Sequence, residues 1–217
     1  GVAQIQVEDP DQLTFKRSVE AEYPLPERKG SVTPLNSRAA TRIAQAIPDL
    51  SDTSKQLLVR NLLHAVGLDA KIRRTGDTNV RMDAVGLSAN GRPFVAEIEL
   101  SQNFLESPRA LLEDLAVLHS RYGFDISDID PLSIVFQLPN TRSEYYRVLD
   151  DIAVVLSIRC RTITVGALLV LIWSHMELKS FEGDAFALSE ERKDLTNYLN
   201  KGDSVVEPYL GAFKPAK

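Results

Sequence analysis

The sequence is poor in the residues that form cross-links and zinc sites. Its 217 residues include one cysteine, Cys160, and three histidines. A single cysteine excludes an internal disulfide, and no cysteines and histidines cluster at the spacing of a zinc site. The sequence therefore excludes disulfide-stabilised folds and zinc fingers.

Long apolar runs are also missing. The longest, from Val165 to Trp173, has nine residues, whereas a membrane-spanning helix needs about 20. The sequence does not begin with a charged and then apolar secretion signal, so we expect a cytoplasmic protein with no membrane partner. It also has no Gly-x-Ser-x-Gly elbow and no glycine-rich phosphate loop. An unrelated α/β hydrolase or protein-interaction domain therefore has no motif in its support.

The remaining composition is that of a soluble globular protein, with 44% hydrophobic and 25% charged residues. Capping signals, such as Ser51 or Asp52 and Ser107-Pro108, and stop signals, such as Gly67 and Gly123, delimit the expected helices. Short apolar and β-branched runs between them predict strands. The predicted helices are 37–46, 53–66, 107–122, 143–157 and 165–178, and the predicted strands are 70–74, 79–87, 92–100, 132–138 and 159–163.

This order predicts one α/β domain. Helices that alternate with the later strands imply a mixed central sheet flanked by helices on both faces, with the core order αβββαβαβα. We assign residues 1–35, which contain four prolines, to an N-terminal arm and residues 36–180 to the domain itself. Residues 181–217 form an acidic C-terminal extension packed on the same domain, with a short helix near 189–200.

The most informative segment runs from Arg81 to Leu100 and reads as a hairpin with acids on both strands. Side chains alternate between the faces of a strand, so Glu97 and Glu99 share a face about 6–7 Å apart. Two carboxylates on one face of an apolar strand need a positive partner, and Mg²⁺ is the usual one because it takes oxygen ligands. The alternative is an ordinary solvated face on an edge strand.

The length of the hairpin loop decides whether Asp83 joins these glutamates. A two-residue loop at Asn90-Gly91 would place Asp83 opposite Ile98, on the wrong face. A three-residue loop, Ala89-Asn90-Gly91 with Gly91 in the left-handed region, pairs Ser88 with Arg92 and therefore Asp83 with Glu97. The metal interpretation thus requires the three-residue loop.

An aspartate on the second strand followed by Glu-x-Glu on the third resembles the restriction-endonuclease-like, PD-(D/E)XK nuclease superfamily. The match covers residues 51–138 and extends to 178. The resemblance implies that Asp83 and Glu97 bind Mg²⁺ or Mn²⁺, and it places Glu99 where the family usually has a lysine. Some restriction enzymes of the superfamily carry glutamate there, as a base or second-metal ligand, so Glu99 is expected to be both catalytic and metal-binding. Met82 replaces the motif's proline, which is a common variation.

The resemblance adds two further candidates. Some relatives, notably viral cap-snatching endonucleases, bind metal through a histidine on the helix before the sheet, where this chain has His64. Others recruit a basic residue from the helix after the third strand, which makes Arg109 the candidate catalytic substitute for the missing lysine. A surface histidine and a solvated surface arginine are the alternatives.

A locally basic region accompanies the acids, although the net charge is −5. From Arg38 to Arg74 there are seven Lys and Arg against three Asp. A basic surface can hold phosphates, and a solvated face is the alternative. The candidate nucleic-acid contacts are Arg60, Arg73, Arg74, Arg81 and Arg92.

The resemblance therefore implies a metal-dependent DNA endonuclease that hydrolyses phosphodiester bonds in restriction, phage defence or mobile-DNA processing. Its expected partner is double-stranded DNA, and cutting both strands implies a homodimer. The alternative is an inactive nuclease-fold protein that serves as a nucleic-acid-binding or assembly module, which the missing lysine and the acidic net charge favour.

Overall fold

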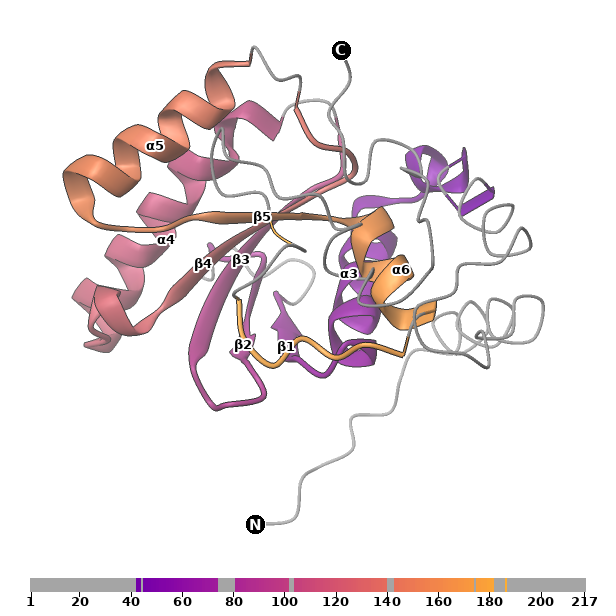
Figure 1. Ribbon diagram of the computed structural model, residues 1–217, viewed down its shortest axis with the longest axis horizontal. Coiled ribbons are helices and arrows are strands. Elements are labelled where there is room, and N and C mark those ends of the chain that lie inside the picture. Colours follow the sequence, from indigo (N-terminus) through magenta and orange to yellow (C-terminus); the bar gives the residue numbers. More distant parts are fainter. Residues whose placement is uncertain are drawn as a thin grey trace, which may run out of the picture.

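The computed structural model describes residues 42–43, 45–73, 81–101, 104–139, 143–173, 175–181 and 186. Their order is the predicted αβββαβαβα, with three short 3₁₀ turns in addition (Figure 1). The elements are η1 (Ile47–Asp49), α3 (Asp52–Ala65), β1 (Asp69–Ile72), β2 (Ala84–Leu87), β3 (Pro93–Glu99), η2 (Phe104–Glu106), α4 (Ser107–Tyr122), η3 (Ile126–Asp128), β4 (Asp130–Val135), α5 (Glu144–Leu156), β5 (Arg161–Thr164) and α6 (Val165–Trp173).

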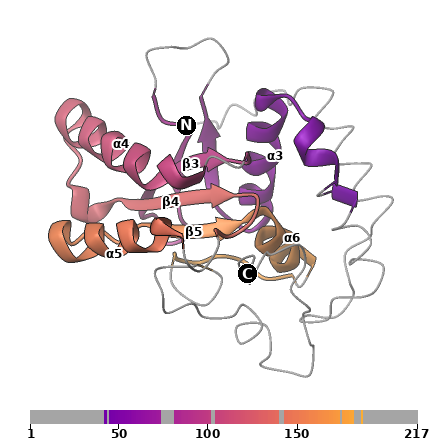
Figure 2. The same cartoon turned by 90° about the horizontal axis from the view of Figure 1, so that it is seen from above.

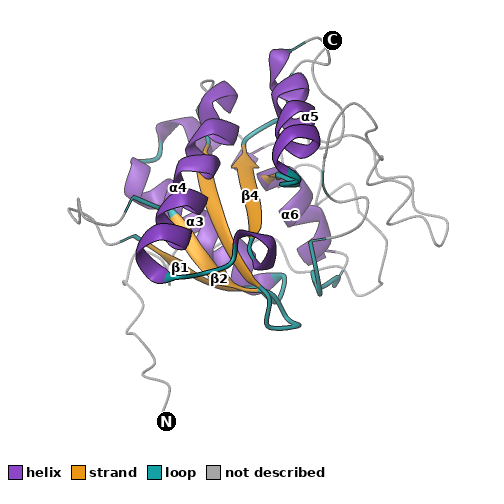
Figure 3. Cartoon of the chain, turned by 90° about the vertical axis from the view of Figure 1, so that its left-hand side faces the viewer, coloured by secondary structure: helices purple, strands orange, loops and turns teal. Residues whose placement is uncertain are grey.

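The strands form one mixed sheet in the order β1-β2-β3-β4-β5. The pairs β1–β2 and β2–β3 are antiparallel, and β3–β4 and β4–β5 are parallel. Helices α3 and α6 cover one face and α4 and α5 the other, as Figures 2 and 3 show. The expected fold class, a mixed α/β sheet flanked by helices on both faces, is confirmed.

The two faces of β3 pack on different cores. Phe94 and Ala96 belong to the core beneath α3 and α6, and Val95 belongs to the core beneath α4 and α5. Because side chains alternate along a strand, Glu97 and Glu99 fall on the Val95 side, toward α4. The prediction that Glu97 and Glu99 share one face of this strand is therefore correct.

The β2–β3 hairpin has the three-residue loop that the metal interpretation requires. Gly91 has φ +78°, its N–H donates to Ser88 O over 2.8 Å, and Ser88 N–H donates to Arg92 O over 2.9 Å. The ladder then pairs Ala84 with Ala96. One residue further, Asp83 lies across from Glu97, as predicted.

Close packing around β2 depends on a glycine. A Cβ built on Gly86 would stand 2.0 Å from Asp69 O and 2.6 Å from a ring carbon of Phe94. The missing side chain therefore lets β1 and the Phe94 ring approach the β2 backbone.

We expect Gly86→Ala to destabilise the fold by about 3 kcal/mol or more, because overpacking costs about 1–3 kcal/mol even when side chains give way, and here a backbone oxygen blocks the methyl group. Chemical unfolding of the two proteins measures the difference. Gly91→Ala is the matched control, since its Cβ would have nothing within 4 Å and only the positive φ would be strained. A Gly86→Ala protein as stable as the wild type would contradict this packing.

Most helix ends follow the sequence signals. Ser51 caps α3 by accepting from Ser54 N–H, Ser143 caps α5 through Tyr145 N–H, and Gly123 ends α4 with φ +73°. The prediction that Ser107 caps α4 is wrong. The turn η2 leads directly into the helix, so Ser107 is already helical and Glu106 occupies the cap position without a side-chain bond.

Helix α6 is shorter than predicted. It ends at Trp173, and His175 adopts φ +53° while its N–H donates to Ile172 O and the Met176 N–H donates to Leu171 O. This paired arrangement closes the helix end in the manner usually made by glycine. The chain then turns back, and Leu178 N–H donates to Val66 O over 2.8 Å.

The predicted segments near the two ends of the chain lie mostly outside the described residues. The predicted arm 1–35, the helix 189–200 and most of the helix 37–46 lie outside the described residues. Phe181 and Phe186, at the start of the predicted extension, belong to the core beneath α3 and α6, where Phe181 packs on Phe94 with ring centroids 5.2 Å apart. Among the described residues, no helix has the length and apolar character needed to cross a membrane.

Candidate acidic site at the end of the sheet

Asp83 is fixed by contacts with three elements at the start of β2. Its backbone oxygen accepts from Arg73 N–H after β1, and its Oδ2 accepts from Ile98 N–H of β3 over 3.1 Å. Its Oδ1 accepts from Gln56 Nε2 of α3 over 3.2 Å and lies 3.8 Å from Arg73 Nη2. The carboxylate is therefore held at the sheet end in one position.

The two glutamates of β3 differ in their surroundings. Glu99 Oε1 accepts from Ser101 N–H over 2.9 Å, so that carboxylate folds back on its own chain. Glu97 is half-buried, and its carboxyl makes no hydrogen bond or ion pair with any residue that the structure describes. Glu97 is thus the acid without a local partner.

A fourth acid, Asp114, faces this group from α4. Its side chain is 1% exposed, and Oδ1 lies 3.8 Å from Arg81 Nε. Its Oδ2 is buried and has no hydrogen-bond partner in the described part of the chain. A buried carboxylate oxygen without a partner is costly, so its presence here needs a reason.

Burial, with a smaller contribution from mutual repulsion, changes the protonation of these acids. Burial raises the pKa of Glu97 to about 8, and the carboxylates of Asp83, Asp114 and Glu99 add to this rise while Arg81 opposes it. Burial also raises the pKa of Asp114 to about 6, against Arg81. The pKa of Asp83 is raised by burial despite the bond from Ile98 N–H. At neutral pH, without a further positive charge, Glu97 keeps its proton.

The chemistry of this group fits a hard divalent cation. Every ligand atom that this group offers is a carboxylate oxygen, and Mg²⁺ and Mn²⁺ prefer oxygen ligands. Burial and, to a smaller extent, mutual repulsion raise the pKa values of these acids, so a cation would stabilise their ionised forms, and the orphan oxygen of Asp114 offers a free lone pair. The side chains are not, however, already arranged as ligands: among the described residues, no three His, Cys, Asp or Glu form a metal-holding group.

Two predicted site residues lie apart from these acids. His64 Nε2 donates to Ala70 O of β1 over 2.9 Å when that nitrogen carries the proton. Arg109 pairs with Glu106 at 3.2 Å, and both side chains are largely exposed. Neither residue is among the charges that act on Asp83, Glu97 or Asp114. The structure brings together Asp83, Glu97 and Glu99 without His64 or Arg109.

The five predicted nucleic-acid contacts are scattered. Arg73 lies beside Asp83, and Arg81 pairs with Glu113 and approaches Asp114. Arg60 donates to Asn61 Oδ1, and Arg92 lies at the opposite end of β3. Arg74 falls outside the described residues. Among the described residues, the positive charges nearest the acids are therefore Arg73 and Arg81.

Sequence reasoning missed Asp114, although a signal was present. Leu111, Leu115 and Leu118 form one stripe of α4, and Asp114 falls inside it at helical spacing. An acid within the buried stripe of a helix is rare unless it is paired or functional. The helix was predicted, but the exception within its apolar face was not used.

Comparisons with known proteins add little to this description. No family model matches the chain, and no curated protein matches it. Among solved structures, the restriction endonuclease FokI matches with a TM-score of 0.42 and 10% identity, over 82% of this chain and 33% of FokI. The chain thus spans about a third of the length of that protein.

Proposed function

We propose that this protein is a metal-dependent nuclease that hydrolyses phosphodiester bonds of DNA at the acidic end of its sheet. The observation that carries the proposal is the buried group of Asp83, Glu97 and Asp114, whose raised pKa values and orphan oxygen call for a cation. The hairpin register that places Asp83 across from Glu97 supports it. Cutting both strands of a duplex requires two such sites, so the proposal includes a homodimer.

Each residue has a distinct part in the proposed reaction. A bound Mg²⁺ or Mn²⁺ would supply positive charge for the phosphate oxygens and lower the pKa of a water molecule. Asp83, Glu97 and Asp114 would hold that ion, with Glu97 giving up its proton on loading. Glu99 would accept a proton from the attacking water as a general base. Arg73 and Arg81 would offset phosphate charge beside the acids.

A second candidate has its own supporting observation. Glu99 replaces the usual lysine and folds onto Ser101 N–H, and no ready-made group of metal ligands exists among the described residues. A nuclease-fold protein that binds nucleic acid without cutting it fits these two features. Binding of DNA without cleavage in Mg²⁺ or Mn²⁺ would favour this candidate.

The test is cleavage of supercoiled plasmid by the wild type with Mg²⁺, with Mn²⁺ and with EDTA. Cleavage is expected with either metal and none with EDTA. Asp83→Asn should reduce it by about 10²–10⁴-fold, because charge stabilisation by a metal is worth several kcal/mol and each 1.4 kcal/mol is tenfold. Asparagine still offers an oxygen to Ile98 N–H, so the fold should persist.

Glu106→Gln is the matched control, since Glu106 is 71% exposed and contacts Arg109 outside the acidic group. It should cut like the wild type. Cleavage that survives EDTA, or an Asp83→Asn protein as active as the wild type, would overturn the proposal.

A further inference from the structure

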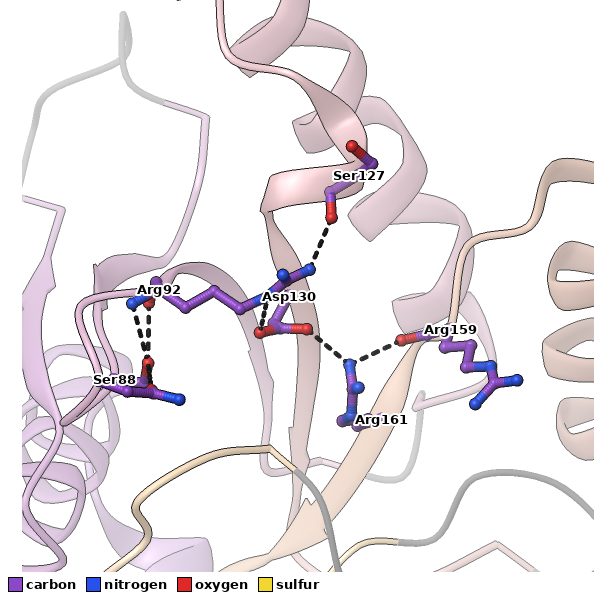
Figure 4. A network of polar contacts seen from close by, with 7 residues as sticks. Ser88, Arg92, Ser127, Asp130, Arg159 and Arg161 are labelled. Carbon is purple, nitrogen blue, oxygen red and sulfur yellow. Dashed lines mark hydrogen bonds and ion pairs between the residues drawn. The ribbon is translucent and has the colours of Figure 1, made fainter.

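A second charged site lies at the opposite end of the sheet from the acids. Asp130, the first residue of β4, is opposite Phe94, whereas Glu97 is opposite Ser133. Three residues of strand separate these positions by about 10 Å. In Figure 4, Asp130 lies between Arg92 and Arg161, and the backbone oxygen of Arg159 faces Arg161.

Asp130 holds two arginines with separate oxygens. Its Oδ2 accepts from Arg92 Nε over 2.6 Å, and its Oδ1 accepts from Arg161 Nη1 over 2.9 Å. Arg92 Nη2 also donates to Ser127 O over 2.6 Å, and Arg161 Nη1 to Arg159 O over 3.2 Å. The Asp130 side chain is 8% exposed and that of Arg161 is 13% exposed, so this network is fixed rather than solvated.

The network lines a cavity of about 570 Å³ between α4, η3 and the turn after α5. Arg159 also lines it, and its guanidinium has no hydrogen bond or ion pair with the described part of the chain. Three arginines thus contribute to the lining against one acid, Asp130, among its described residues. The described lining therefore has an excess of two positive charges.

The rest of the wall is aliphatic. Leu112 and Leu115 come from α4, and Ile129 and Ile158 from the loops before β4 and β5. A cavity of 300–1,000 Å³ with apolar walls and a few fixed polar groups is the usual form of a small-molecule site. Guanidiniums that keep N–H groups free are suited to two-point binding of carboxylate or phosphate.

We propose that this cavity binds a small organic anion, with its carboxylate or phosphate at Arg159 and its apolar body against α4. The ion pairs with Asp130 account for Arg92 and Arg161. They leave Arg159, which has no partner in the described part of the chain, and the open volume beside it without a structural explanation. The site is separate from the acidic end of the sheet and does not depend on the proposed nuclease activity.

Calorimetry with four probes tests the proposal: AMP and octanoate as anions with a ring or an alkyl body, adenosine as the uncharged counterpart, and inorganic phosphate as the head group alone. Saturable binding of AMP or octanoate is expected, and whichever binds identifies the body that fits. Arg159→Gln should weaken that binding by about tenfold, the value of one charge-assisted hydrogen bond. Arg147→Gln, an exposed change on α5 outside the cavity, should not alter it.

Three results would overturn the proposal. These are no binding of either anion at millimolar concentration, equal binding by Arg159→Gln and the wild type, or adenosine or inorganic phosphate binding as tightly as AMP. Thermal unfolding of Arg159→Gln verifies that the variant is folded, which is expected because the Arg159 side chain is exposed.

Discussion

Replacing Glu97 with glutamine should make the protein more stable at alkaline pH and abolish its response to divalent metal. Glu97 has an ordinary pKa of 4.5 and a pKa of about 8 in the fold. Between these values the folded protein holds a proton that the unfolded chain has lost. The stabilising effect of protonated Glu97 is complete below about pH 4.5 and is lost as the pH rises to about 8.

Glutamine does not titrate, so the stability advantage of Glu97→Gln should grow from pH 4.5 to pH 8 and then stay constant. A pKa unit corresponds to about 1.4 kcal/mol, and allowing for the partial exposure of Glu97 we expect a gain of about 1–3 kcal/mol at pH 8.5. Urea unfolding in EDTA at pH 5 and pH 8.5 measures it. Parallel pH dependences for the two proteins would show that Glu97 does not carry the raised pKa.

The same variant should lose the effects of metal. In the wild type, Mn²⁺ should raise the melting temperature, because an ion that binds only the folded state stabilises it, and it should support cleavage. In Glu97→Gln both effects should disappear. Glu106→Gln, an exposed change, should respond to Mn²⁺ as the wild type does. Equal stabilisation of Glu97→Gln by Mn²⁺ would remove this residue from the proposed ion site.

Asp130→Ala should be the most destabilising single change outside the apolar core. Removing one partner of a buried ion pair costs about 3–5 kcal/mol, because the other charge stays buried without compensation. Arg161, 13% exposed, would be left in that state. For a protein of this size we expect a fall in melting temperature of about 6–20 °C.

Arg92→Gln is the comparison for that experiment. Arg92 is 45% exposed, and Asp130 would keep Arg161 as its partner after the change. A loss of about 1 kcal/mol or less is expected for such a partly solvated pair. If both variants lost the same stability, the ion pair with Arg161 would not be the dominant contact of Asp130.

The sequence predicted local features well because each has a local cause. The cap at Ser51, the glycine stops and the alternation along β3 all follow from residues within a few positions of one another, whereas the predicted cap at Ser107 gave way to the turn η2. The hairpin register followed from Asn90-Gly91 and from the requirement that Asp83 meet Glu97. These local signals were enough to predict the order of helices and strands. They also identified Asp83, Glu97 and Glu99, three of the four acids at the site.

What could not be predicted depends on contacts between distant segments. Asp114 reaches the acids only because α4 crosses the Val95 face of β3. Arg92 was a candidate nucleic-acid contact, but it precedes β3 at the end away from the acids, where β4 brings Asp130 to it from 38 residues away. His64 bonds to Ala70 O because α3 packs beside β1. Each outcome needs the three-dimensional arrangement of the sheet and its helices.

The turn from Ala89 to Gly91 has a consequence for recognising relatives of this chain. The number of residues in the turn sets the register between β2 and β3. In a homologue with one residue more or fewer there, the aspartate would therefore lie on the opposite face of the sheet from the glutamates. The turn residues themselves can vary, provided that the residue at the position of Gly91 can still adopt a positive φ. Distant homologues should therefore keep the fourteen-residue interval between the aspartate and the first glutamate more faithfully than the letters that fill it.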